Sequence, residues 1–183
     1  MLIIPKSFFE RKAEVVAKDL LGKIIVRKLK KKKLKALIVE TEAYYGTKDP
    51  ASRAYSGKKT KLNAPMWGEP GTILVYMVHG NWLFNIVTGE KDNPQAVLIR
   101  AVEPLNFKAK SSGPGKVTKA LKITKKHNWQ NVCSAKSKIN VLSSAKREFK
   151  IGRSHRIGVR KDLKKKLRFF ILGNEFVSKY KFL

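Results

Sequence analysis

The sequence predicts an α+β domain built around a largely antiparallel sheet. Short apolar runs of strand length follow one another with only a tight turn between them, as neighbouring antiparallel strands do. Segments with helical spacing lie between these runs, so helices and strands are interspersed. The chain has 183 residues and neither an internal repeat nor a clear boundary, so one domain is expected over residues 1–183.

The first forty residues predict one helix and two strands. Ser7 and Glu10 form a capping-box pattern at the start of the helix. Apolar side chains then recur at helical spacing, namely Phe9, Ala13, Val16 and Leu20. Strands are expected at residues 24–26 and 34–39, on either side of four consecutive lysines. These lysines, Lys30 to Lys33, fit a solvated turn, and contact with phosphate is the alternative.

A hairpin is predicted in the middle of the chain. Glu69-Pro70-Gly71 suits a type II turn, and it precedes a strand at residues 72–79. Gly80-Asn81 is a two-residue hairpin signal, after which the chain returns at residues 82–87. A further strand is expected at residues 96–102, beyond a polar loop.

The C-terminal half is less regular. A short helix is expected at residues 116–123, after a flexible loop. The pattern between residues 129 and 149 fits neither a helix nor a strand clearly. The end of the chain predicts a second hairpin, in which a strand at residues 168–172 turns at Gly173-Asn174 and returns at residues 176–180.

The charge of the chain is strongly one-sided. Lys and Arg total 41 against 13 Asp and Glu, which gives a formal net charge of +28. Such an excess indicates a polyanionic partner, because basic side chains displace counterions from phosphates. Nucleic acid is the first interpretation, and an anionic membrane surface is the second. A lysine bias of the source proteome, as in some thermophiles, would account for only part of the excess.

The cysteine content and the hydropathy indicate an intracellular protein. One cysteine, Cys133, excludes an internal disulfide and fits a reducing compartment. No apolar stretch approaches the roughly 18 residues needed to cross a bilayer, and the N-terminus lacks the layout of a signal peptide. We therefore expect a soluble protein without membrane contact, located in the cytoplasm or at the nucleoid, or in the nucleus of a eukaryote.

The segment from residue 38 to residue 57 carries the most informative polar residues. An apolar run leads into Glu40 and Glu42, and Tyr44 follows at the same spacing. In an extended chain these three side chains share one face, so that an acid lies beside an aromatic ring. The functional interpretation is an acid placed for catalysis. The alternative is a strand end that carries solvated charges.

The other polar residues narrow the chemistry. The three histidines of the chain are far apart and lack cysteine companions, so no metal site is expected. The sequence contains no phosphate-binding loop, dinucleotide fingerprint or nucleophile elbow. Arg100 lies inside a predicted strand, where a guanidinium needs a carboxylate partner or a ligand. A carboxylate, aromatic rings and a cation together suit hydrolysis at a flat, electron-poor ring system, with the acid orienting water.

The hairpin expected at residues 72–87 gives a second signal. Tyr76 lies in its first strand, and His79 and Trp82 bracket its turn. Flat side chains at a hairpin tip can enter the groove of a duplex and fill the gap left by a displaced base. The alternative is that Tyr76 and Trp82 are core aromatics, which is the commoner location of such residues.

Several motifs occur in one order along the chain. They are VETEAYYG at residues 39–46, DPASRAY at 49–55, PGTILVY at 70–76, the hairpin with Asn85, and LIRAVEP at 98–104. Together they resemble the alkyladenine (3-methyladenine, methylpurine) DNA glycosylase family, over nearly the whole chain. The resemblance implies one compact methylpurine-DNA-glycosylase-like domain over residues 1–183, with a curved antiparallel sheet, surrounding helices and a protruding β-hairpin.

The resemblance also implies an activity. A monofunctional glycosylase of this kind flips damaged purines out of double-stranded DNA and hydrolyses their N-glycosidic bond, as a monomer with neither cofactor nor metal. The lesions of this class are 3-methyladenine, 7-methylguanine, hypoxanthine and ethenoadenine. Glu42 matches the general base that activates water, and Arg100 matches the arginine that holds this carboxylate and the water. The carbonyl of Val159 matches the backbone acceptor of the same water.

The base-binding residues and the hairpin match the family with three departures. Tyr44 and Tyr76 match the rings on either side of the flipped base, and Asn85 matches the amide that helps exclude guanine-like exocyclic groups. Arg53 stands where the family usually has His, and it keeps the backbone N–H that contacts the base. His79 stands where the family has an intercalating Tyr, and the return strand of the hairpin is one residue shorter than usual. Further DNA contacts are expected from Thr60, Met66, Asn81 and Trp82.

Two alternatives to this activity stay open. The departures at Arg53 and His79 also fit a nucleic-acid-binding protein on a catalytically altered glycosylase scaffold. A bifunctional lyase that uses a lysine through a Schiff base is the other alternative. Five lysines are candidates for phosphate contacts, although solvation is the commoner state of such residues, namely Lys58, Lys59, Lys61, Lys116 and Lys119.

Overall fold

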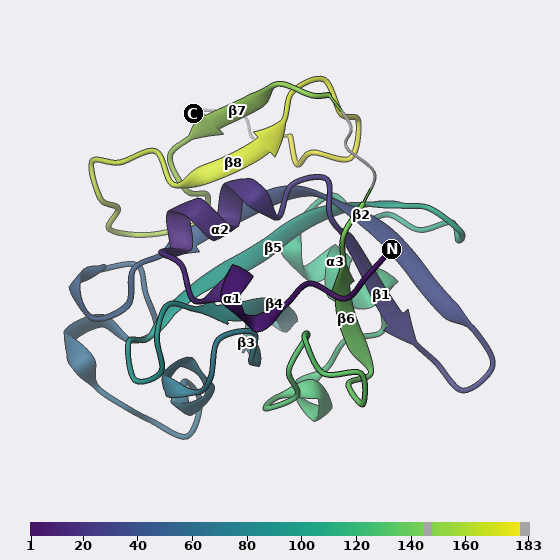
Figure 1. The fold of residues 1–183 in the computed structure, drawn as a ribbon. Coiled ribbons are helices and arrows are strands. Elements are labelled where there is room, and N and C mark those ends of the chain that lie inside the picture. The colour runs from purple at the N-terminus through teal and green to yellow at the C-terminus, as the bar shows by residue number, and fades with distance from the viewer. Residues whose placement is uncertain (145–147, 180–183) are drawn as a thin grey trace.

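The computed structural model describes residues 1–144 and 148–179, and in this part of the chain eight strands form one curled antiparallel sheet (Figure 1). The strands are β1 (Ile24–Lys28), β2 (Lys33–Tyr44), β3 (Ile73–Val78), β4 (Asn81–Thr88), β5 (Gln95–Pro104), β6 (Ile139–Leu142), β7 (Ile151–Ser154) and β8 (Arg168–Ile171). With the helices that pack around this sheet, they confirm the α+β prediction.

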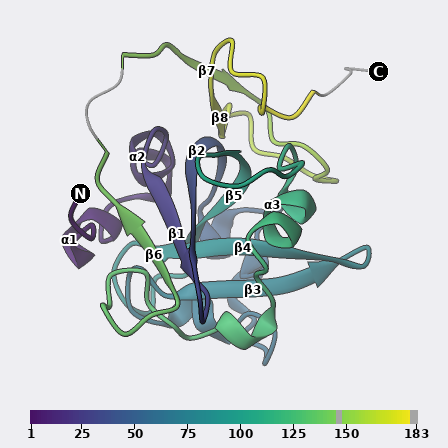
Figure 2. The same ribbon diagram turned by 90° about the vertical axis from the view of Figure 1, so that its right-hand side faces the viewer.

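The helices are short and lie on both faces of the sheet. The α-helices in the described residues are α1 (Lys6–Phe9), α2 (Ala13–Asp19) and α3 (Pro114–Ala120). The 3₁₀ helices there are η1 (Gly46–Lys48), η2 (Tyr55–Gly57), η3 (Ala64–Trp67) and η4 (Lys125–His127). Figures 1 and 2 show α2 on one side of β2 and β5 and α3 on the other. The core residues of α2, such as Val16 and Ala17, are fully buried against the sheet.

The order of the strands is β3-β4-β5-β2-β1-β6, and β8 pairs with both β2 and β7. One edge of β2 is shared by two partners, because β1 pairs with it as far as Leu37 and β8 pairs with it from Glu40 to Glu42. On its other edge, the register of β2 with β5 shifts between Ile38 and Thr41. Such bulges bend a strand and re-aim its side chains. Glu40 and Glu42 therefore lie where the sheet divides.

The β3–β4 hairpin extends away from the body of the protein (Figure 2), as expected. Its turn is His79-Gly80 rather than Gly80-Asn81, because Val78 pairs with Asn81 as the last residues of the two strands. Both turn residues have positive φ angles, 46° at His79 and 72° at Gly80. Two positive φ angles are the requirement of the type I′ turn, whose twist matches that of paired strands.

The predicted N-terminal helix is divided into α1 and α2. Ser7 lies inside α1 and does not cap it, and no side chain caps either helix. The break has a tertiary cause, because the backbone groups of this segment bond to a distant loop. The N–H of Gly89 donates to the carbonyls of Phe9 and Arg11, and the side chain of Gln95 accepts from the N–H of Ala13.

The predicted C-terminal hairpin is wrong. The partner of β8 is β7 and not the segment that follows it, and residues 176–179 form no strand. Tyr180, the last residue of the predicted return strand, lies outside the described residues. The reason is visible at Ser178, whose N–H and hydroxyl both donate to Glu40. This segment bonds to a buried carboxylate instead of to a strand.

The remaining predictions are confirmed with shifted ends. Strands occur at each of the five other expected positions, and the ambiguous segment at residues 129–149 contains β6. The predicted helix at residues 116–123 is α3, which begins at Pro114 and ends at Ala120. The turn before β3 has the expected form, because the N–H of Thr72 donates to the carbonyl of Glu69 and Gly71 has a φ of 84°. All four lysines of the predicted turn are exposed, and the last of them, Lys33, is the first residue of β2.

Candidate active site

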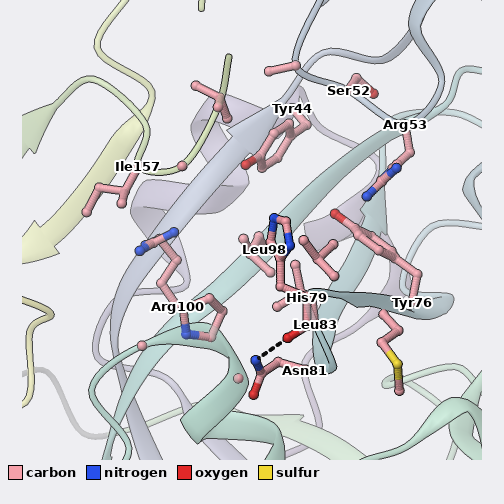
Figure 3. Close-up of a pocket in the computed structure, with 18 of the residues that line it drawn as sticks. Tyr44, Ser52, Arg53, Tyr76, His79, Asn81, Leu83, Leu98, Arg100 and Ile157 are labelled. Atoms are coloured by element: carbon pink, nitrogen blue, oxygen red, sulfur yellow. Dashed lines mark hydrogen bonds between the residues drawn. The ribbon is translucent and has the colours of Figure 1, made fainter. Parts of the chain in front are cut away.

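An open cleft of about 1100 Å³ lies beside the end of β2, the tip of the β3–β4 hairpin and two loops, residues 50–53 and 157–161 (Figure 3). Seven of the predicted site residues line it, namely Tyr44, Arg53, Tyr76, His79, Asn81, Arg100 and Val159. Asn85 and Met66 line a small adjoining cavity, whose wall also includes Tyr44 and Tyr76. Residues that are far apart in the sequence therefore meet at one cleft.

Glu42 does not itself line this cleft, because its side chain is 0% exposed, but it contacts three residues that do, namely Tyr44, Arg100 and Ile157. One carboxylate oxygen, Oε1, accepts the backbone N–H of Ile157 at 2.7 Å and lies 3.2 Å from Nη1 of Arg100. The other oxygen, Oε2, accepts the hydroxyl of Tyr44 at 2.8 Å. Burial raises the pKa of Glu42 above its ordinary value, although Arg100, Ile157 and Tyr44 each act in the opposite direction. The alternative of a solvated strand end is therefore wrong.

Glu40 has a different environment, although it is also fully buried. Its Oε1 accepts from Nε of Arg100 at 2.9 Å and from Nε of Arg168 at 2.7 Å, and Ser178 donates to both of its oxygens. Burial alone would raise the pKa of Glu40, but the two arginines and Ser178 outweigh it, so the pKa is lowered. Neighbouring carboxylates whose pKa values are pushed apart are suited to different roles, and here Glu42 is the one suited to accept a proton.

Arg156 fixes the loop that delivers Ile157 to Glu42. Its guanidinium is 0% exposed and bonds to both oxygens of Asp49, at 2.6 and 2.8 Å. Asp162 holds its other side, with Nε of Arg156 2.9 Å from Oδ1. The guanidinium carbon lies 4.6 Å from the centre of the Tyr44 ring, so Arg156 also supports that ring. A buried, bidentate pair of this kind gives geometric precision.

Three residues of this site were not predicted from the sequence, namely Arg156, Asp49 and Ile157. Their positions in the sequence could have indicated a role. Asp49 is the first residue of DPASRAY, and Arg156 is the first residue of RIGV, the segment that ends at Val159. The pairing of Asp49 with Arg156 could not be predicted from the sequence, because the two residues are 107 positions apart. The donor at Ile157 is a backbone N–H, which every residue except proline has, so the residue type does not indicate this hydrogen bond.

Tyr44 and Tyr76 form the aromatic part of the cleft (Figure 3). Tyr76 comes from β3 and is 9% exposed, and the guanidinium carbon of Arg53 lies 4.9 Å from the centre of its ring. Burial raises the pKa of both tyrosine hydroxyls, so both remain donors at neutral pH. Asn85 is buried, and its amide donates to the carbonyls of Leu83 and Leu74 at 3.3 and 3.4 Å.

The other predicted residues lie in three different settings. His79 is exposed at the hairpin tip, and its carbonyl accepts from the side chain of Asn81 at 2.9 Å (Figure 3). Thr60 is exposed in a loop, whereas Met66 is only 2% exposed. Trp82 is half-buried and packs against the core. The five candidate phosphate-binding lysines are exposed, and Lys116 lines the cleft.

The described residues contain neither a cluster of metal ligands nor a membrane-spanning helix. In residues 1–144 and 148–179, no group of three or more His, Cys, Asp or Glu side chains is arranged to hold a metal ion. No helix in the same part of the chain is both long and apolar enough to cross a membrane. Cys133 is half-buried, and burial raises the pKa of its thiol to about 11.

Residues 7–175 match the sequence model of the methylpurine-DNA glycosylase (MPG) family. The chain belongs to this family. Membership supports a DNA glycosylase role, that is, a hydrolase of DNA repair that acts on N-glycosyl bonds. The family match covers the cleft, both of its aromatic side chains and the Glu42–Arg100 pair.

Relatives of similar length agree with this assignment. A protein of Clostridium tetani named "Putative 3-methyladenine DNA glycosylase" is 39% identical, over 96% of this chain and 98% of its own length. Proteins with the same name from Aeropyrum pernix and Borrelia garinii subsp. bavariensis are each 40% identical. The matches cover 97% of this chain and 93% of the Aeropyrum protein, and 95% of this chain and 98% of the Borrelia protein.

Proposed function

We propose that this glycosylase excises damaged purines from duplex DNA, with Glu42 as the general base that activates water. The observation that carries the proposal is the setting of Glu42. Its carboxylate is fully buried behind three residues that line an open cleft, both of its oxygens are held, and burial raises its pKa above the ordinary value. A base is most effective when its pKa lies near the working pH and its geometry is fixed beforehand.

The proposed reaction is hydrolysis at the sugar. The bond between C1′ and N9 breaks, and its electron pair leaves with the purine while positive charge develops on the sugar. The carboxylate of Glu42 stabilises that charge and takes a proton from the attacking water, whose oxygen adds to C1′. Arg100 holds the carboxylate from the protein side, at 3.2 Å from Oε1. The carbonyl of Val159, at the cleft wall, is the proposed acceptor for the other hydrogen of this water.

The proposed base site lies between Tyr44 and Tyr76. An enzyme of this class has to take the target base out of the stack before it can reach C1′. The two rings supply flat apolar faces for the base, and Asn85 supplies an amide at the adjoining cavity. His79, at the tip of the hairpin, is the proposed wedge that fills the gap in the duplex.

Double-stranded DNA is the proposed partner of the cleft, and the protein is proposed to act on it as a monomer. The net charge of +28 supplies a strong attraction to phosphate. Lys116 and Lys161 line the cleft, and the exposed lysines of the loop at residues 58–61 lie close to Arg53 in the chain. Binding is therefore expected to weaken steeply as salt is added.

Release of free base by the wild-type protein tests this function. The protein is incubated with duplexes that each carry one 3-methyladenine, 7-methylguanine, hypoxanthine or ethenoadenine, and free base is measured by chromatography. Release of at least one purine supports the proposal. Tight binding of every duplex without release would indicate the alternative, a nucleic-acid-binding protein on a glycosylase scaffold.

A parallel reaction distinguishes a monofunctional enzyme from a lyase. A lyase would join Lys116, Lys161 or another lysine to C1′ through a Schiff base, which borohydride reduces to a stable crosslink. We expect base release without strand cleavage and without a crosslink. A borohydride-dependent protein–DNA adduct that disappears in a Lys116→Gln or Lys161→Gln variant would favour the lyase.

A further inference from the structure

Arg53 places a positive charge at the wall of the proposed base site. It belongs to the loop between η1 and η2, and its guanidinium carbon lies 4.9 Å from the centre of the Tyr76 ring. Figure 3 shows the side chain of Arg53 beside Tyr76, on the side of the cleft where Tyr44 also lies. A base held between the two tyrosines would therefore lie close to this guanidinium.

The charge of Arg53 differs in its partners from those of Arg100 and Arg156, two arginines that contact Glu42 or Tyr44. Arg100 lies between the carboxylates of Glu40 and Glu42, and Arg156 lies between those of Asp49 and Asp162. In the part of the chain that the structure describes, Arg53 forms no salt bridge. Its charge is available to whatever occupies the cleft.

The backbone of Arg53 is held in place, so its side chain begins at a defined position beside the cleft. Asn63, which is 3% exposed, donates from its amide to the carbonyls of Arg53 and Lys58 at 2.7 and 2.9 Å. The hydroxyl of Ser52 accepts the N–H of Ala54 at 3.1 Å. The side chain of Arg53 itself is exposed in the free protein. DNA bound over the cleft would cover it and remove the water that screens its charge.

A fixed cation at this place affects two kinds of purine lesion differently. A purine alkylated at a ring nitrogen, such as 7-methylguanine, is already cationic and leaves as a neutral base. A deaminated purine such as hypoxanthine is neutral. When the C1′–N9 bond breaks, its electron pair stays on the purine, which therefore departs as an anion that solvent then protonates. A guanidinium repels the first substrate when it binds, and it stabilises the charge that develops on the second. The guanidinium can also donate to the O6 and N7 acceptors of an oxopurine.

We infer that Arg53 sets the lesion preference of this enzyme, favouring neutral purine lesions over cationic N-alkylpurines. The inference rests on the proposed glycosylase function. It assigns to Arg53 a direct contact with the base, with an effect whose sign depends on the charge of the lesion. A general role in attracting DNA would act equally on both kinds of lesion.

Single-turnover release from two duplexes tests the inference. The duplexes are identical except for the lesion, hypoxanthine in one and 7-methylguanine in the other, and each rate is divided by the rate of spontaneous release. The ratio of the two normalised rates is measured for the wild-type protein, Arg53→Gln and Arg53→Lys. Lys58→Gln is the matched control, because it removes an exposed cation just beyond η2, five positions from Arg53 in the chain.

Arg53→Gln is expected to lower the hypoxanthine rate and raise the 7-methylguanine rate, changing their ratio by about tenfold or more. Arg53→Lys is expected to keep most of the wild-type ratio because it keeps the charge, and Lys58→Gln is expected to change both rates by the same factor. An unchanged ratio in Arg53→Gln, or an equal change of ratio in Lys58→Gln, would overturn the inference while the glycosylase function stands. If the wild-type protein releases neither of these two bases but releases 3-methyladenine or ethenoadenine, the inference fails while the glycosylase function stands. If it releases none of the four purines, the proposed function fails and the inference fails with it.

Discussion

The backbone N–H of Ile157 donates to the carboxylate of Glu42 at 2.7 Å, across 115 positions of sequence. This bond joins a strand of the central sheet to a loop near the other end of the chain. The loop is held there by Arg156, which Asp49 anchors on the far side of Tyr44. The position of Glu42, the proposed general base, thus depends on the buried Asp49–Arg156 ion pair, which does not itself line the cleft.

Asp49→Asn is expected to destabilise the protein strongly. Arg156 would then lack the fully buried one of its two carboxylate partners, and loss of a partner from a buried pair typically costs about 3 to 5 kcal/mol. The free energy of unfolding in urea measures this loss. Asp19→Asn removes the partner of Arg11 in an exposed pair and is the control, with a near wild-type midpoint expected. Equal midpoints for both variants would contradict the anchoring role of Asp49.

The release rate is expected to fall on the acid side with an apparent pKa above 4.5, the ordinary value for Glu42. The reason is that burial raises the pKa of Glu42, and the protonated carboxyl cannot accept a proton from water. Activity is therefore gained as pH rises through the raised pKa. Single-turnover rates on hypoxanthine, measured across the acid range, give the profile. An inflection at or below 4.5 would contradict the assignment.

Tyr44→Phe is expected to move this inflection to higher pH. The hydroxyl of Tyr44 donates to Oε2 of Glu42 and lowers its pKa, so its removal leaves the carboxylate less stabilised. The ring remains to stack on the base, so duplex affinity should be preserved. The pH profile and a binding titration are measured on the same preparation. A profile that coincides with that of the wild type would show that this hydrogen bond does not tune Glu42.

His79→Ala is expected to slow release from a fully paired duplex by about tenfold or more, since a wedge offsets a few kcal/mol of unstacking. Release from an unpaired, bulged lesion should change little, because that base is already displaced. Met77→Ala, which truncates another exposed side chain of the same hairpin that also lines the cleft, serves as the control. If both substrates slow equally in His79→Ala, His79 acts on something other than base displacement.

The sequence predicted the elements whose signals are local. The β3–β4 hairpin followed from two apolar runs and a Gly turn, and its one-residue error arose because His79, a residue not typical of positive φ, occupies the first turn position. The helix predicted at residues 7–20 is divided in the structure because Gly89 and Gln95 form hydrogen bonds with backbone groups of residues 9–13. Such bonds to distant residues have no local pattern, so periodicity alone could not show the break.

The site was predictable to the extent that it rests on side-chain type. Glu42, Tyr44, Tyr76 and Arg100 were singled out from the sequence, and the structure brings them together at one cleft. The role of Glu40 as the buried partner of Arg100 and Arg168 depends on a bulge and on strand pairing, and the Asp49–Arg156 pair depends on a loop closure. Both are tertiary relationships, which residue types alone do not specify.

Base release by Glu42→Gln tests the central claim most directly. The variant keeps the size of the side chain but loses the proton acceptor, and Glu90→Gln, which changes an exposed glutamate outside the cleft, is the control. We predict that Glu42→Gln binds the lesion duplex as the wild type does and releases base about 10² to 10⁴ times more slowly, while Glu90→Gln releases base at the wild-type rate. Release by Glu42→Gln at the wild-type rate would contradict the account.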